Sequence, residues 1–79
     1  MKSYQFIQHM GDGNEILSHP QYGKQIWTLV NVRKDKKCII TGELLKGKKG
    51  YLPIGNAGNR MERISETGME QIITLNKAS

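Results

Sequence analysis

Seven of the chain's twelve basic side chains fall within one stretch of seventeen residues, and they are its strongest chemical signal. They are Arg33, Lys34, Lys36, Lys37, Lys46, Lys48 and Lys49. With Asp35 and Glu43 included, the stretch from 33 to 49 nets +5, which equals the net charge of the whole chain. Lysine and arginine pair with phosphate oxygens, so a local excess of them favours a polyanion as partner.

The sequence therefore predicts a non-catalytic nucleic-acid-binding domain that contacts phosphates through these two lysine-rich segments. Arg60 and Arg63 extend the predicted surface, and Tyr51 is predicted to stack on an exposed base. Lysine outnumbers arginine nine to three. Because arginine is the better bidentate reader of base edges, this ratio favours binding without sequence preference.

Three other interpretations of the same residues stay open. Lysines on hairpin turns also keep a protein soluble and protect sheet edges from aggregation. The alternative function is a small protein-interaction module, such as an inhibitor or regulator, that docks on an acidic surface of a larger protein. The segment from Tyr51 to Ile54 would then supply an apolar anchor. A homodimer formed through a strand edge is compatible with both functions.

The geometry of residues 37–45 decides whether the basic residues form one surface. If this segment is one extended strand, the two basic turns lie about 30 Å apart at ~3.3 Å per residue. If the chain instead bends sharply at Thr41 and Gly42, the turns become neighbours. Glycine permits such a bend but does not require it.

Other chemistry has little support in the sequence, and we expect no enzyme, no metal and no cofactor. The candidate ligands Cys38, His9 and His19 lack the spacing of a zinc site. Cys38 is expected to be a small buried side chain, with a pKa that Lys36 and Lys37 would lower if the thiol were exposed. A stripe of Glu62, Glu66 and Glu70 is interpreted as solvated surface, and the glycine-rich segment 55–60 as a structural loop rather than a phosphate cradle.

The expected elements are mostly short strands separated by turn signals. Strands are predicted at 3–10, 15–17, 25–32, 38–41 and 51–54, with the third central and Pro53 marking the last as an edge. Gly11 to Asn14 is the strongest turn signal. A short helix is expected to follow Ser65 as N-cap, with Met69, Ile72 and Ile73 on its buried face. Gly68 weakens the start of this helix, and residues 72–75 would also suit a strand.

Three short motifs resemble segments of known families. Gly47 to Pro53 resembles the closing segment of Src-homology-3 domains, which implies a small barrel. Asn56 replaces the tyrosine expected after the proline and the paired tryptophans are missing, so polyproline binding is not implied. The stretch from Gly42 to Gly50 is similar to the glycine-lysine turn of ribosome-associated KOW motifs, which implies RNA. Cys38 to Gly42 is similar to half a zinc knuckle, with Thr41 in the second ligand place.

Length and composition bound the whole molecule. Residues 1–79 are enough for a single small domain with a marginal core. One cysteine allows no disulfide within the chain, and the N-terminal residues lack the apolar run of a signal peptide, so a cytoplasmic location is expected. No stretch has enough apolar residues to span a bilayer, so no membrane partner is expected. The predicted fold class is mainly β (α+β): a small antiparallel meander or partly closed barrel of about five strands with a short C-terminal helix.

Overall fold

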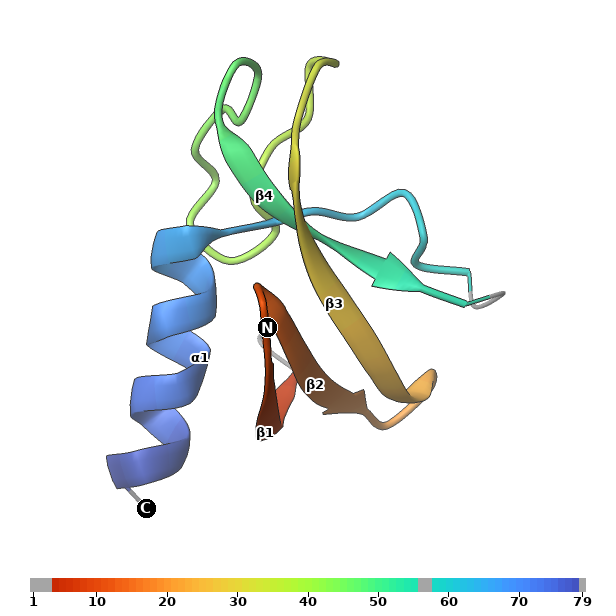
Figure 1. Cartoon of the computed structure of the whole chain (residues 1–79), viewed down its shortest axis with the longest axis vertical. Helices are drawn as coiled ribbons and strands as arrows, with labels where there is room; N and C mark the ends of the chain where they lie inside the picture. The colour runs from red at the N-terminus through yellow and green to blue at the C-terminus, as the bar shows by residue number, and fades with distance from the viewer. Residues whose placement is uncertain (1–3, 56–57, 79) are drawn as a thin grey trace.

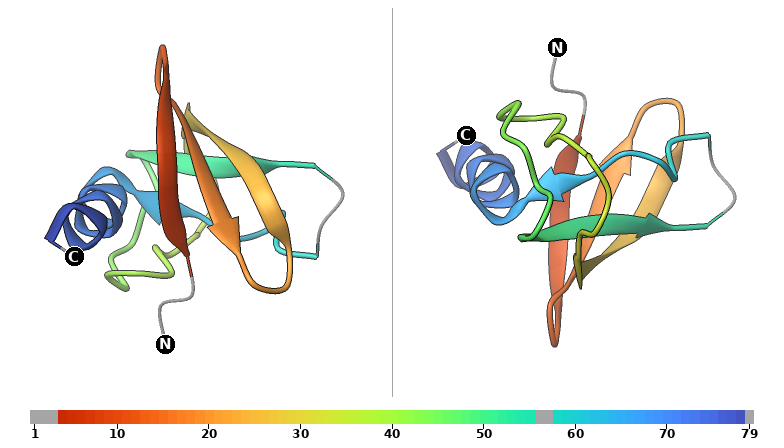
Figure 2. Two further views of the ribbon diagram at one scale, coloured as in Figure 1. Left: turned by 90° about the horizontal axis from the view of Figure 1, so that it is seen from below. Right: turned by 90° about the horizontal axis from the view of Figure 1, so that it is seen from above.

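The computed structural model describes residues 4–55 and 58–78, which form a curled antiparallel sheet and one helix (Figure 1). The strands are β1 (Gln5–Gly11), β2 (Asn14–His19), β3 (Gly23–Asn31), β4 (Lys49–Ile54) and β5 (Ile64–Ser65), followed by helix α1 (Glu66–Ala78). They pair in chain order, β1-β2-β3-β4-β5. Figure 2 shows that the sheet curls into a half-barrel with α1 beside β1. The predicted mainly β fold is confirmed.

The first hairpin forms where the turn signal predicted it. Gly11, Asp12 and Gly13 all have positive φ, at 82°, 53° and 78°. Glycine adopts this region at little cost, and aspartate tolerates it better than most side chains. Gly11 then pairs with Asn14, and β1 and β2 run antiparallel from there.

The core lies on the concave side of the sheet, under the central strand β3. Along β3 the buried side chains of Gln25 and Trp27 alternate with the exposed Ile26, as the period of two in a strand requires. Trp27 and Leu17 have no exposed surface. Ile64 and Met69 complete this core from β5 and α1.

The predicted strand at 38–41 is wrong, because this segment is a turn. The Gly42 N–H donates to the Cys38 carbonyl at 2.9 Å, and Gly42 takes a φ of 80°. Cys38 makes only a single bridge, to Arg63. The β-branched run Ile39-Ile40-Thr41 has the strand propensity on which the prediction rested, but local hydrogen bonds to Cys38 hold it in the turn.

The strand from 51 to 54 is not the last strand, and its part beyond Tyr51, which includes Pro53, lies on an open edge of the sheet. It belongs to β4, which pairs with β3 along its length and with β5 at Gly50 and Tyr51. Strand β5 was not predicted, because its two residues are too few to show the alternation of apolar and polar side chains that marks a strand. Pro53 is compatible with β4 since the pairing with β5 ends at Tyr51.

Helix α1 begins as its sequence predicted. The Gly68 N–H donates to Ser65 Oγ at 2.8 Å, which makes Ser65 the N-cap. Met69 and Ile72 are buried and Ile73 packs against the same core. Glu62 precedes the helix, so the predicted stripe of three glutamates is reduced to Glu66 and Glu70. In the described part of the chain, no helix has both the length and the apolar character needed to cross a membrane.

Candidate functional site

A sharp bend brings the two basic turns together. The Cys38 N–H donates to the Glu43 carbonyl and the Leu45 N–H donates to the Lys36 carbonyl, so the chain doubles back on itself. Farther from the bend, Val32 and Lys48 are joined by an N–H···O bond of 2.8 Å. The two turns are thus neighbours rather than the opposite ends of one strand.

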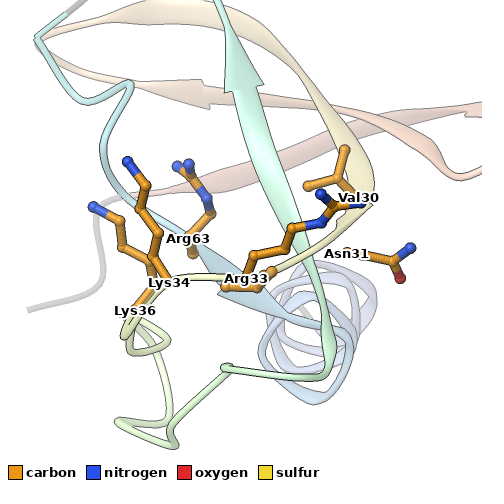
Figure 3. Close-up of a pocket in the computed structure, with 7 residues that line it drawn as sticks. Val30, Asn31, Arg33, Lys34, Lys36 and Arg63 are labelled. Atoms are coloured by element: carbon orange, nitrogen blue, oxygen red, sulfur yellow. The ribbon is translucent and has the colours of Figure 1, made fainter.

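A surface pocket of about 210 Å³ lies where the first basic turn meets the segment before β5 (Figure 3). Four of its lining side chains are cationic. Three come from the turn after β3, and the fourth, Arg63, comes from a segment about thirty positions later in the chain. The lining residues are Val30, Asn31, Val32, Arg33, Lys34, Lys36 and Arg63.

Backbone contacts fix the position of Arg63 in this pocket. The Ile39 N–H donates to the Arg63 carbonyl at 3.0 Å, which ties the segment before β5 to the bend. The guanidinium Nη1 donates to the carbonyls of Arg60 and Glu62, at 3.0 and 2.8 Å. Burial lowers the pKa of Arg63, because a partly desolvated cation loses hydration. An anion in the pocket would compensate that loss.

Two of the other three cations of the pocket extend toward the side of Arg63. In Figure 3 the side chains of Lys34 and Lys36 extend to the same side as the Arg63 guanidinium, whereas Arg33 extends along the end of β3 toward Val30. Among the described residues, none of these four cations forms an ion pair. They form a concentrated positive charge on a concave surface.

The second basic turn is partly neutralised. Lys46 Nζ lies 3.8 Å from Asp35 Oδ1, and Lys48 Nζ lies 3.7 Å from Glu43 Oε2. The pKa of Glu43 is lowered, first by a hydrogen bond from the Ser65 side chain and also by the charge of Lys48. Asp35 and Glu43, the two acidic residues of the basic stretch, therefore lie near lysines of the second turn. Neither of them lines the pocket.

The remaining predicted site residues lie outside the pocket. Lys37 and Lys49 are exposed, the latter at the start of β4. Arg60 is exposed in the turn before Arg63. Tyr51 is only 8% exposed and belongs to the core, so its ring offers no face for base stacking. Burial raises the pKa of Tyr51, as do the nearby carboxylates of Glu15 and Glu66.

The structure also holds an aromatic ladder that the sequence did not indicate. The Trp27 ring meets Tyr4 edge-on at a centroid distance of 5.2 Å, and Tyr4 lies 4.7 Å from His19. His19 then stacks on Tyr22 at 4.6 Å with an interplanar angle of 28°. The sequence from His19 to Gly23 is typical of a turn. Its one signal for the ladder is that His19 and Tyr22 lie on either side of this turn, where their rings can meet.

A buried polar network anchors the same region. Gln25 Nε2 donates to Asn59 Oδ1 at 2.9 Å, and Asn59 Nδ2 donates back to Gln25 Oε1 at 2.8 Å. Asn59 Nδ2 also donates to the Tyr4 hydroxyl, which donates to Glu62 Oε1 at 2.7 Å. Burial, followed by the hydrogen bond to Glu62, raises the pKa of Tyr4. This network fixes the segment that leads to Arg63.

Cys38 is buried at 2% exposure, as expected, but its surroundings differ from the prediction. Burial disfavours its thiolate, yet hydrogen bonds from Ser65 and Thr41 to the sulfur outweigh burial and lower its pKa to about 7. The N–H groups of Ile40, Thr41 and Ser65 lie 3.2 to 3.3 Å from Sγ. The neighbouring lysines are not the cause.

The three side chains considered as zinc ligands are spread over the fold. His9 Nδ1 contacts Glu15 Oε1, His19 belongs to the aromatic ladder, and Cys38 lies under α1. Within residues 4–55 and 58–78, no three His, Cys, Asp or Glu side chains are grouped closely enough to hold a metal ion. The glycine-rich loop at 55–60 includes positions 56 and 57, which lie outside the described residues.

The chain matches no protein-family model, and neither a curated protein nor a solved structure is significantly similar to it.

Proposed function

We propose that this protein is a non-catalytic nucleic-acid-binding domain whose phosphate site is the cationic pocket of Arg33, Lys34, Lys36 and Arg63. The observation that supports the proposal is the convergence of four cationic side chains from two distant segments on one concave site. Like charges gathered around one pocket repel one another, and a bound polyanion relieves that repulsion.

The test measures the affinity for a labelled oligonucleotide by fluorescence anisotropy at low salt. Lys34→Gln/Lys36→Gln removes two cations from the pocket, and we expect the dissociation constant to rise about tenfold, or about 1.4 kcal/mol. The matched control is Lys46→Gln/Lys48→Gln, which changes the net charge equally. Its effect should be smaller because Asp35 and Glu43 lie within 4 Å of these two lysines and partly offset their charge.

Two results would refute the proposal. One is the absence of binding to any oligonucleotide by the wild-type protein at low salt. The other is an equal loss of affinity in the two double variants, because net charge and not the pocket would then govern binding.

A second candidate function is docking on an acidic surface of a larger protein, as an inhibitor or regulator. One observation favours it. Ile26 and Ile54 are paired directly across β3 and β4 on the outer face of the sheet, and they are 37% and 54% exposed. In the segment first considered as an anchor, Tyr51 and Pro53 are buried, so Ile54 with its partner Ile26 would serve instead. Affinity capture from a nuclease-treated lysate separates the two functions, since only a protein partner survives the nuclease.

Three further assignments belong to the same proposal. The Gly47–Pro53 segment, which forms a turn and most of β4, supports a Src-homology-3-like half-barrel. The single reduced thiol supports a cytoplasmic location. A homodimer through a strand edge is tested by light scattering. If the wild-type protein is dimeric, Ile54→Lys, at the open edge of β4, should give a monomer.

A further inference from the structure

The aromatic ladder ends in Tyr22, a half-buried ring that keeps part of its surface exposed. It runs from Trp27, which is fully buried, through Tyr4 and His19 to Tyr22. Among the described residues, His19 is the one ring that Tyr22 contacts, and Tyr22 keeps part of its surface exposed. The Gln21 N–H donates to His19 Nδ1 at 3.0 Å and holds that ring in place. Tyr22 is thus a partly exposed ring that is supported by the His19 ring.

The segment 58–63 joins this ring to the cationic pocket. A methyl group on Gly58 would lie 3.9 Å from Tyr22 Cε1, so the segment starts in contact with the ring. It ends at Arg63 in the pocket, and five residue steps span at most about 18 Å. A short stretch of nucleic acid can cover that distance.

The side chains along this segment favour a polyanion. Arg60 is exposed, and Met61 is 59% exposed and offers an apolar, polarisable contact. Glu62, the one acidic residue between Gly58 and Arg63, accepts a hydrogen bond from the Tyr4 hydroxyl and is partly buried. The outward groups of the segment are therefore cationic or apolar.

We propose that the ligand is single-stranded nucleic acid, with its phosphates in the pocket and one base stacked on Tyr22. This inference rests on the proposed function and adds its substrate class. The base would be the next ring of the ladder, after Trp27, Tyr4, His19 and Tyr22. In a duplex the faces of the bases are covered by their neighbours, so only an unpaired base or a strand end can reach the Tyr22 ring. Stacking of this kind tolerates any base, in agreement with the lysine-rich pocket.

The experiment compares three probes by fluorescence anisotropy at one salt concentration: a short oligothymidylate, an abasic oligomer of the same length, and a duplex. We expect the wild-type protein to bind the oligothymidylate about tenfold more tightly than the abasic oligomer. Tyr22→Ala should abolish this preference and leave affinity for the abasic oligomer unchanged. Tyr22→Phe keeps the ring and should behave like the wild-type protein.

The outcomes separate this inference from the proposed function. Three results would overturn the stacking site and leave phosphate binding intact. They are equal affinity of the wild-type protein for the two single strands, tighter binding of the duplex, and an unchanged preference in Tyr22→Ala. Failure of the wild-type protein to bind all three probes would overturn the proposed function itself. Intrinsic fluorescence of the buried Trp27 verifies that both variants are folded.

Discussion

At the scale of single residues, charge alone does not identify the site. Lys46 and Lys48 carry the same charge as Lys34 and Lys36, but each lies within 4 Å of a carboxylate. The sequence could predict that this stretch is basic, because residue types suffice for that. It could not predict which lysines are neutralised, since those pairings depend on the bend between the two turns.

Asn59 provides a test of the buried polar network. Asn59→Ala leaves the Gln25 side chain buried without its partner, and we expect the free energy of unfolding to fall by about 2 kcal/mol. Asn14→Ala is the matched control, because Asn14 accepts a single hydrogen bond from Thr28 in a half-buried site. Urea denaturation measures both. Equal losses would show that the network adds nothing to an ordinary side-chain hydrogen bond.

The Cys38 thiol predicts a pH dependence of stability. Its pKa falls from 9.0 to about 7 on folding, which means that the folded state stabilises the thiolate relative to the thiol. The contribution of this thiolate to the stability of the fold is complete above pH 9 and is lost as the pH falls through 7. The control is Cys38→Ser, which keeps a hydrogen-bond acceptor but does not titrate. As the pH rises from 7 to 9, the free energy of unfolding of the wild-type protein should increase relative to that of Cys38→Ser. Parallel pH profiles of the two proteins in urea denaturation would contradict this.

At the scale of elements, local hydrogen bonding outweighs propensity at the bend. The sequence predicted the first three strands and the helix correctly, because each has a strong periodic or capping signal. Residues 38–41 have strand propensity, yet three N–H groups around the Cys38 sulfur and the positive φ of Gly42 hold a turn. Such contacts join Cys38 to Ser65, far along the chain, and no local pattern reveals them.

Gly68 tests how closely α1 packs on this bend. A methyl group there would lie 2.8 Å from Cys38 Sγ and 3.1 Å from Ile40 Cβ. Gly68→Ala should therefore destabilise the protein by about 1 kcal/mol or more, even though alanine favours a helix by about 1 kcal/mol. Thr74→Ala, at an exposed position of α1, should be neutral or stabilising. A stabilised Gly68→Ala variant in urea denaturation would show that α1 can move away from the bend.

At the scale of the whole molecule, the half-barrel turns a local feature of the sequence into a surface. The bend places the two basic turns side by side, the bridge from Cys38 to Arg63 adds a cation from the far end of the chain, and the acidic side chains of the stretch face away. The charge excess could be predicted from composition. The pocket could not, because its residues meet only through long-range contacts.

The salt dependence of nucleic-acid binding is the most direct measurement of whether this pocket holds phosphates. For a single strand, the logarithm of the affinity falls with the logarithm of the salt concentration by about 0.7 for each phosphate neutralised. Lys34→Gln/Lys36→Gln should therefore reduce the slope by about 1.4 relative to the wild-type protein, and Lys46→Gln/Lys48→Gln should reduce it less. The same slope in all three proteins would contradict a phosphate site in the pocket.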